Sequence, residues 1–193
     1  MRSFLLFTIV LFIFCQNDYA QERTKAVFDV KEICKDAADK GNSALAELTT
    51  ATNCTLPDLE GALSYFRPGA YIEVSTLRTP ELIRLTPKEY ALGLNALHCS
   101  SQRRYKTMKF LFDDIDPADV QVLQKGDTIW AIAPVRQLFI GRAVPGQSDY
   151  SDITFKNIVS CYYFDENEIL HGDIDHVDAV KTLPYHPGRR LRG

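Results

Sequence analysis

The chain has 193 residues and a formal net charge of −3, and 46% of its residues are hydrophobic. This length and composition suit one globular domain with a sizeable core. The mild acidity argues against nucleic acid as a partner, because binding to phosphates requires a basic surface.

The first twenty residues predict a secretory signal peptide. Arg2 supplies a positive start, an apolar stretch covers 4–14, and a polar segment leads to Ala20. A bilayer-spanning helix needs about twenty apolar residues, so this stretch is too short to serve as a membrane anchor. We therefore expect a signal peptide over 1–20, one domain over 21–180 and a flexible basic tail over 181–193. The mature protein would be periplasmic or extracellular, with no membrane span after processing.

Three helices are predicted in the first half of the chain. Apolar residues recur at helical spacing over 24–40, and Gly41 is expected to end that helix. A hydroxyl cap and an early proline at 55–58 predict a second helix that stops at 67–69. At 86–89 a capping box is combined with proline at the first helical position, which predicts a third helix.

The second half of the chain predicts long strands. Short strands at 70–77 and 82–85 precede alternating segments at 105–112, 120–124, 128–140, 153–164 and 169–177. Pro134 lies inside one of these segments, which indicates a strand edge or a bulge. Because helices come first and strands follow, we expect an α+β fold in which N-terminal helices pack on a strongly curved antiparallel sheet.

The order of these elements resembles the nuclear transport factor 2-like superfamily, which includes SnoaL-like and cystatin-like α+β proteins. Residues 63–74, Leu-Ser-Tyr-Phe-Arg-Pro-Gly-Ala-Tyr-Ile-Glu-Val, look like the helix-to-strand junction of that superfamily. The resemblance covers roughly 24–179. It implies a cone-shaped half-barrel with a pocket between helices and sheet, and often a homodimer formed through the sheet. It implies no single activity, because the superfamily contains isomerases, cyclases, dehydratases and binding modules.

One departure from the superfamily bears on chemistry. In its ketosteroid isomerases an aspartate general base directly follows the Ile/Val-Glu of the strand. Val74 occupies that position here and cannot transfer a proton. The sequence therefore argues against isomerase chemistry.

Four cysteines remain after removal of the signal peptide: Cys34, Cys54, Cys99 and Cys161. In an oxidising compartment they permit one or two disulfides, with three full pairings. The alternative is that Cys99 and Cys161 are buried thiols. No Cys-x-x-Cys pair is present, so we expect no metal site built on these residues.

The segment 171–178 concentrates groups capable of chemistry. Strand alternation places His171, Asp173 and Asp175 on one face, where His171 and Asp173 could form a general acid/base pair. The same three residues could instead hold a divalent metal, or they could form a solvated strand end that discourages edge pairing. Among the aromatic residues, Tyr71, Trp130 and Tyr163 are candidates to contact a ligand, and the alternative for each is a place in the core.

These observations favour an exported module that binds a small apolar or amphiphilic ligand, or a protein partner, without catalysis. The alternative is a SnoaL- or dehydratase-type enzyme that acts on a small hydrophobic substrate through His171 and Asp173. The sequence has no Gly-x-Ser-x-Gly elbow, phosphate-binding loop or dinucleotide fingerprint, so we expect no cofactor. The two hypotheses differ in one geometric requirement: the enzyme needs His171 to face the helix-covered side of the sheet.

Overall fold

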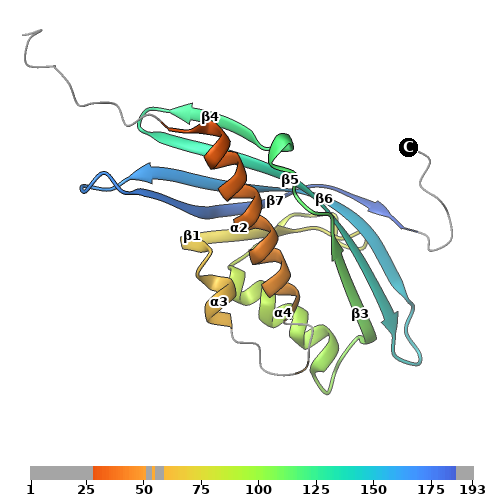
Figure 1. Cartoon of the computed structure of the whole chain (residues 1–193). Coiled ribbons are helices and arrows are strands. Elements are labelled where there is room, and N and C mark those ends of the chain that lie inside the picture. Colours follow the sequence, from red (N-terminus) through yellow and green to blue (C-terminus); the bar gives the residue numbers. More distant parts are fainter. Residues whose placement is uncertain (1–27, 51–53, 55–58, 186–193) are drawn as a thin grey trace, which may run out of the picture.

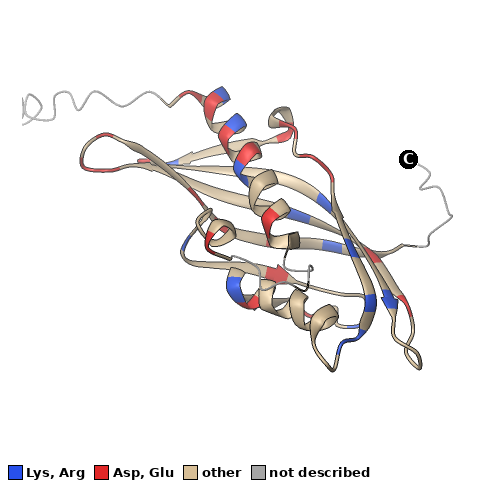
Figure 2. Cartoon of the chain, turned by 60° about the horizontal axis from the view of Figure 1, so that its bottom comes forward, with Lys and Arg blue, Asp and Glu red and all other residues tan. Residues whose placement is uncertain are grey.

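The computed structural model describes residues 28–50, 54 and 59–185. The predicted signal peptide and the arginine-rich end of the predicted tail lie outside these residues. Within them, no helix is both long and apolar enough to cross a membrane. Acidic and basic residues are intermixed over the longest helix and the sheet (Figure 2), in keeping with the small net charge.

The helices are α2 (Val30–Thr50), α3 (Leu59–Leu63) and α4 (Pro87–Cys99). The prediction for α4 is confirmed: the Thr86 hydroxyl accepts from the Glu89 N–H, and the Glu89 carboxylate accepts from the Thr86 N–H. The prediction that Gly41 ends the first helix is wrong. A Cβ at Gly41 would lie 2.7 Å from Ile115 Cδ1, so the glycine permits a close approach in mid-helix.

The strands are β1 (Phe66–Val74), β2 (Ile83–Leu85), β3 (Tyr105–Phe112), β4 (Gln121–Lys125), β5 (Thr128–Ala143), β6 (Tyr150–Phe164) and β7 (Leu170–Pro184). A short 3-10 turn, η1 (Pro117–Asp119), lies between β3 and β4. The second helix ends at Leu63 rather than at 67–69, and β1 begins earlier than expected. Gly69, at φ 84°, lies in an irregularity of the β1–β7 register. β7 runs on to Pro184, beyond the domain boundary expected at 180.

The sheet has the strand order β2-β1-β7-β6-β5-β3, and β4 also pairs with β5. The expected α+β fold is confirmed, but the sheet is mixed rather than wholly antiparallel, because β1 and β7 run parallel. Parallel neighbours must be joined by a long connection, and here the connection from β1 to β7 contains every element from β2 to β6. Such a non-local pairing leaves no signal in either strand's own sequence.

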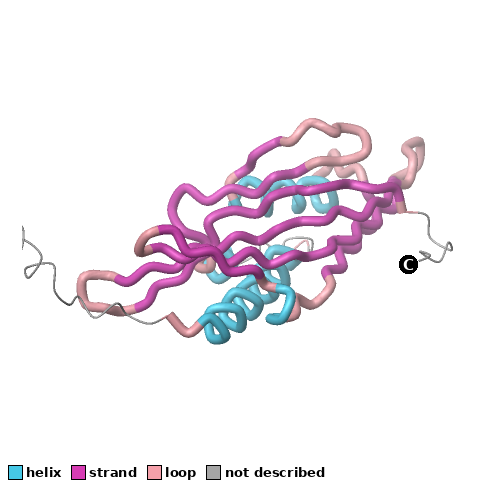
Figure 3. Tube along the Cα trace, turned by 90° about the horizontal axis from the view of Figure 1, so that it is seen from above, coloured by secondary structure: helices cyan, strands magenta, loops and turns pink. Residues whose placement is uncertain are grey.

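Helices α2, α3 and α4 lie on one side of the sheet, inside its curve (Figures 1 and 3). We call this side the helix-covered face and the other the open face. The core lies between the helices and the helix-covered face, with Ile33, Leu48, Ile158 and Ile174 among its most buried members. The fold therefore gives the sheet one enclosed surface and one surface that no helix of the described residues covers.

Pro134 occupies a gap in the pairing of β5. β4 pairs with residues 128–132 of β5 and β3 pairs with 137–143, so Pro134 lies between the two neighbours. The Arg136 carbonyl points to that side, since it accepts from the Asp113 N–H at 3.0 Å. The backbone of Pro134, two residues away, points the same way, so the missing N–H costs the β5–β6 ladder nothing. The expectation of an edge position is confirmed.

Candidate functional site

The polar residues of β6 face inward at one end of the strand. Tyr162 and Ile158 belong to the core, so strand alternation also turns Lys156, Thr154 and Asp152 towards the helices. Each of these three side chains is nearly inaccessible, with 2–4% of its surface exposed. On β5, Gln137 is paired with Thr154 and is likewise buried. We call Gln137, Asp152, Thr154 and Lys156 the polar cluster.

Lys156 places an ammonium group inside the protein. Its Nζ donates to the main-chain oxygen of Glu73 at 2.9 Å and lies 6.0 Å from the centre of the Tyr90 ring. Burial lowers the pKa of Lys156 to about 8, although the charges of Asp152 and Glu73 oppose this change. The amine is therefore partly neutral near physiological pH, which is unusual for lysine.

Asp152 is the carboxylate of the polar cluster. Its Oδ2 accepts from the Tyr150 hydroxyl at 2.5 Å. Burial raises the pKa of Asp152, and the hydrogen bond from Tyr150 and the charge of Lys156 partly oppose the rise. Its Oδ1 is buried and has no hydrogen-bond partner among the described residues. Burial thus favours the neutral form of both Asp152 and Lys156.

Gln137 adds a second buried acceptor. Its Oε1 also has no partner in the described part of the chain. The neighbouring hydroxyl groups, in contrast, satisfy one another: Thr154 Oγ1 lies 3.2 Å from Thr182 Oγ1, which lies 2.7 Å from Ser75 Oγ. Buried polar groups are normally hydrogen-bonded, so Asp152 Oδ1 and Gln137 Oε1 are exceptions among the described residues.

Aromatic rings adjoin the polar cluster. Tyr90 projects from α4 and is buried, and burial together with the charge of Asp152 raises its pKa. Phe139 is paired with Asp152 across β5 and β6, and its ring lies 4.8 Å from that of Phe110 and 5.4 Å from that of Tyr105. The surroundings of the polar cluster are therefore suited to an apolar or aromatic group.

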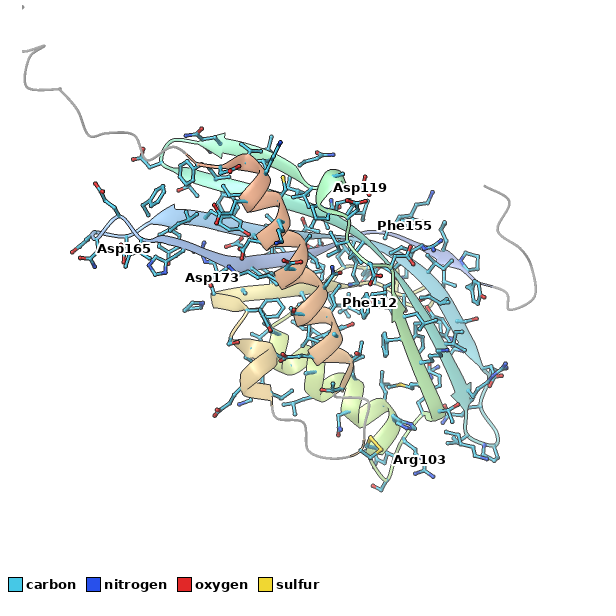
Figure 4. The ribbon with its side chains drawn as sticks, in the orientation of Figure 1. Arg103, Phe112, Asp119, Phe155, Asp165 and Asp173 are labelled. Carbon is cyan, nitrogen blue, oxygen red and sulfur yellow. A yellow bond between two sulfur atoms is a disulfide. The ribbon has the colours of Figure 1, made fainter. Side chains whose placement is uncertain are left out.

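The predicted acid/base pair is placed elsewhere. Gly172 lies beneath the ring of Tyr162, whose hydroxyl donates to Asp36 of α2 at 2.8 Å, so Gly172 faces the helices and His171 faces the open side. His171 Nε2 lies 3.1 Å from Asp165 Oδ2 rather than against Asp173. Asp165 is at the outer end of the β6–β7 hairpin (Figure 4). The geometric requirement for catalysis by His171 on the helix-covered face is not met, and the role of His171 and Asp173 stays a prediction.

The three predicted ligand contacts also lie on the open face. Tyr71 stacks on His176 with ring centres 5.0 Å apart, next to the core residue Ile72 on β1. Trp130 is paired with Cys161 and lies between core residues of β5. Tyr163 is 42% exposed and stacks on His171. The structure does not bring these three residues to the polar cluster, and their contact with a ligand stays a prediction.

Cys54 and Cys99 form a disulfide, and among the described residues Cys34 and Cys161 are free thiols. The disulfide joins the segment before α3 to the last residue of α4, near Arg103 (Figure 4). His98 lies beside it, and these three residues form the one group in the described chain with the spacing of metal ligands. The sulfur atoms of Cys54 and Cys99 are bonded to each other, so neither cysteine offers a thiolate ligand in this state.

No family model and no curated protein matches the sequence. Several solved structures are similar in fold. One is a proposed scytalone dehydratase from Novosphingobium aromaticivorans, with 10% identity, a TM-score of 0.43, and coverage of 83% of this chain and 98% of that one. Another is a type 2 hexachlorocyclohexane dehydrochlorinase, LinA, with 11% identity, a TM-score of 0.44, and coverage of 86% and 98%.

A third similar structure is an uncharacterised cystatin-fold protein from Novosphingobium aromaticivorans. It has 14% identity and a TM-score of 0.34, with coverage of 75% of this chain and 97% of that one. At these identities the likeness is one of fold alone. The chemistry of this protein has to be inferred from its own side chains.

Sequence reasoning missed the polar cluster for a physical reason. Asp152, Thr154 and Lys156 alternate with Ile153 and Phe155, and a polar alternation is normally assigned to solvent. Here the polar side of the strand faces the helices, and Phe155 is 40% exposed on the open face. One signal in the sequence could have revealed this. Lys156 lies on the same side of a single strand as Ile158 and Tyr162, whose residue types predict a place in the core.

Proposed function

We propose that this protein binds a small amphiphilic molecule on the helix-covered face of its sheet. The polar end of the ligand would meet the polar cluster, and its apolar part would lie against Tyr90 and Phe139. The observation that carries this proposal is a pair of buried acceptors without a partner among the described residues, Asp152 Oδ1 and Gln137 Oε1. They lie on the same inward-facing part of β5 and β6 as the Lys156 ammonium. A ligand with one acceptor and one donor would satisfy the ammonium and one of the two acceptors.

Binding without turnover is the simplest use of such a site. Lys156 and Asp152 are held by Glu73 and Tyr150 respectively, which fixes their positions for recognition. We also infer that the protein works after export. The signal-like start of the sequence and the Cys54–Cys99 disulfide support that inference, because disulfides persist in oxidising compartments.

Calorimetric titration with three probes that share a phenyl group tests the proposal. We expect 3-phenyllactate, which has a carboxylate and a hydroxyl, to bind more tightly than 3-phenylpropionate, which lacks the hydroxyl. We expect no binding of 3-phenylpropylamine, because its ammonium would approach Lys156. The variant Lys156→Met should weaken phenyllactate binding by about 10-fold or more, as loss of a charged hydrogen bond implies.

Two control variants separate the two faces of the sheet. Lys181 is exposed on the open face, so Lys181→Met should leave the affinity for phenyllactate unchanged. Tyr163→Ala should also have no effect if the ligand lies under the helices. The proposal is overturned if phenyllactate does not bind, if Lys156→Met binds it as well as the wild type does, or if Tyr163→Ala abolishes binding.

A further inference from the structure

The surroundings of Lys156 suit a covalent bond. An ammonium has three N–H groups, but the described residues offer Lys156 Nζ a single acceptor within hydrogen-bonding distance, the Glu73 carbonyl oxygen at 2.9 Å. No carboxylate of the described chain lies within ion-pair distance of it, so Asp152 acts on it only across a longer separation. A buried ammonium with two unsatisfied N–H groups is costly, whereas a protonated imine has one N–H and needs one acceptor.

We propose that Lys156 captures small aldehydes or ketones reversibly as a protonated imine. The proposal rests on the function proposed above and names the ligand group that faces Lys156 as a carbonyl. The apolar part of the ligand would lie against the aromatic rings beside the polar cluster, and the remaining N–H of the imine would keep the hydrogen bond to the Glu73 oxygen.

The reaction balances with the residues present. The ammonium transfers one proton to the Asp152 carboxylate through a bridging water, because the two groups are not in direct contact. The free amine then adds its electron pair to the carbonyl carbon, so that a C–N bond forms. A proton moves from nitrogen to the former carbonyl oxygen to give the carbinolamine. That hydroxyl then leaves as water with the proton from Asp152 while the C=N bond forms. The net change is ammonium plus carbonyl to protonated imine plus water, with no oxidant or reductant.

The burial of both groups supports these proton transfers. The lowered pKa of Lys156, about 8, makes roughly half of the amine neutral at pH 8, about 100-fold more than for an exposed lysine. The raised pKa of Asp152, caused by burial, helps its carboxyl group to take up and return a proton. Desolvated lysines are the ones that proteins use for imine chemistry.

Reductive trapping tests the proposal on the full mature chain. The protein is incubated with 3-phenylpropanal and cyanoborohydride, which converts an imine to a stable secondary amine, and the modified lysines are identified by peptide mass spectrometry. We expect Lys156 to be labelled at least 10-fold faster than the exposed Lys106 and Lys181, and we expect 3-phenyllactate to slow the labelling of Lys156 alone. The labelling rate of Lys156 should rise to a plateau above about pH 8.

Variants distinguish this proposal from the proposed function. Lys156→Met should remove the fast labelling, and Lys181→Met should retain it. If phenyllactate binds in a Lys156-dependent manner but Lys156 is labelled no faster than Lys106, the imine is overturned and amphiphile binding stands. If phenyllactate does not bind and Lys156 is not labelled, both are overturned.

Discussion

At the scale of single residues, the unusual feature is that charged side chains are buried at positions where strand alternation predicts exposure to solvent. Lys156 and Asp152 lie under the helices with 4% and 3% of their surface exposed. The residues that the sequence singled out for chemistry, His171 and Asp173, lie on the open side of the same hairpin. The sequence pattern did not single out Lys156 and Asp152, because only the direction in which β6 faces shows that they are buried. That direction is set by packing against α2 and α4, which both lie more than fifty residues earlier in the chain.

The buried ammonium makes stability depend on pH in a defined direction. Burial lowers the pKa of Lys156 from 10.5 in the unfolded chain to about 8 in the folded protein. Between these values the unfolded chain binds more protons, so the free energy of unfolding rises with pH, by roughly 3 kcal/mol in total. Urea unfolding of the wild type from pH 7 to 10.5, compared with Lys156→Met, measures this difference. Parallel curves for the two proteins would contradict the burial of a charged Lys156.

At the scale of elements, local signals predicted the start of α4 and most strands, while long-range contacts decided the rest. The capping box of α4 is complete within four residues, so its sequence is sufficient. Gly41 allows Ile115 to approach α2 closely in mid-helix, and the parallel pairing of β1 depends on β7. Neither partner is near in sequence. The general fold was therefore predictable from the element order, and the inward face of β6 was not.

Two glycines test how the elements are packed. A Cβ at Gly172 would overlap the ring of Tyr162 on the paired strand, whereas a Cβ at Gly93, on α4, would meet no atom within 4 Å. We expect Gly172→Ala to lower the free energy of unfolding by about 1–3 kcal/mol, because the ring must move from its place beside Asp36. We expect Gly93→Ala to raise it by about 0.5–1 kcal/mol, as for an unhindered helix position.

Urea unfolding at neutral pH measures both glycine variants on the same scale. The near-ultraviolet circular dichroism of the tyrosines should change in Gly172→Ala and remain as in the wild type in Gly93→Ala. A neutral effect of Gly172→Ala would show that Tyr162 does not lie over the glycine, and the inward assignment of this end of β6 would then be wrong.

At the scale of the whole molecule, the disulfide cross-links two parts of the helical layer, the segment before α3 and the end of α4. Cys54 and Cys99 are 45 residues apart, and the loop that they close contains α3, β1, β2 and all of α4. The sequence left this pairing open among the four cysteines, since spacing alone does not select partners. The choice follows from the fold, which brings the end of α4 to the segment before α3.

Removing this cross-link should destabilise the protein markedly. In the chain-entropy account, a loop of this length contributes about 4 kcal/mol, so the double variant Cys54→Ser, Cys99→Ser should melt roughly 10 °C lower than the wild type. Thermal unfolding with and without a reducing agent measures the effect. A reductant should lower the melting temperature of the wild type and of Cys34→Ala, and should leave the double variant unchanged. An equal melting temperature for the wild type with and without reductant would contradict the bond.

The gap in β5 beside Pro134 has a consequence for the behaviour of the protein at high concentration. Unpaired strand backbone is a template on which a strand from another molecule can add, and such addition begins aggregation. At this gap Pro134 supplies no donor, and the Arg136 carbonyl is already engaged by Asp113. An incoming strand would therefore lose two of the bonds that it needs at the centre of its contact. The interruption between β4 and β3 thus protects the longest strand of the sheet from uncontrolled self-association.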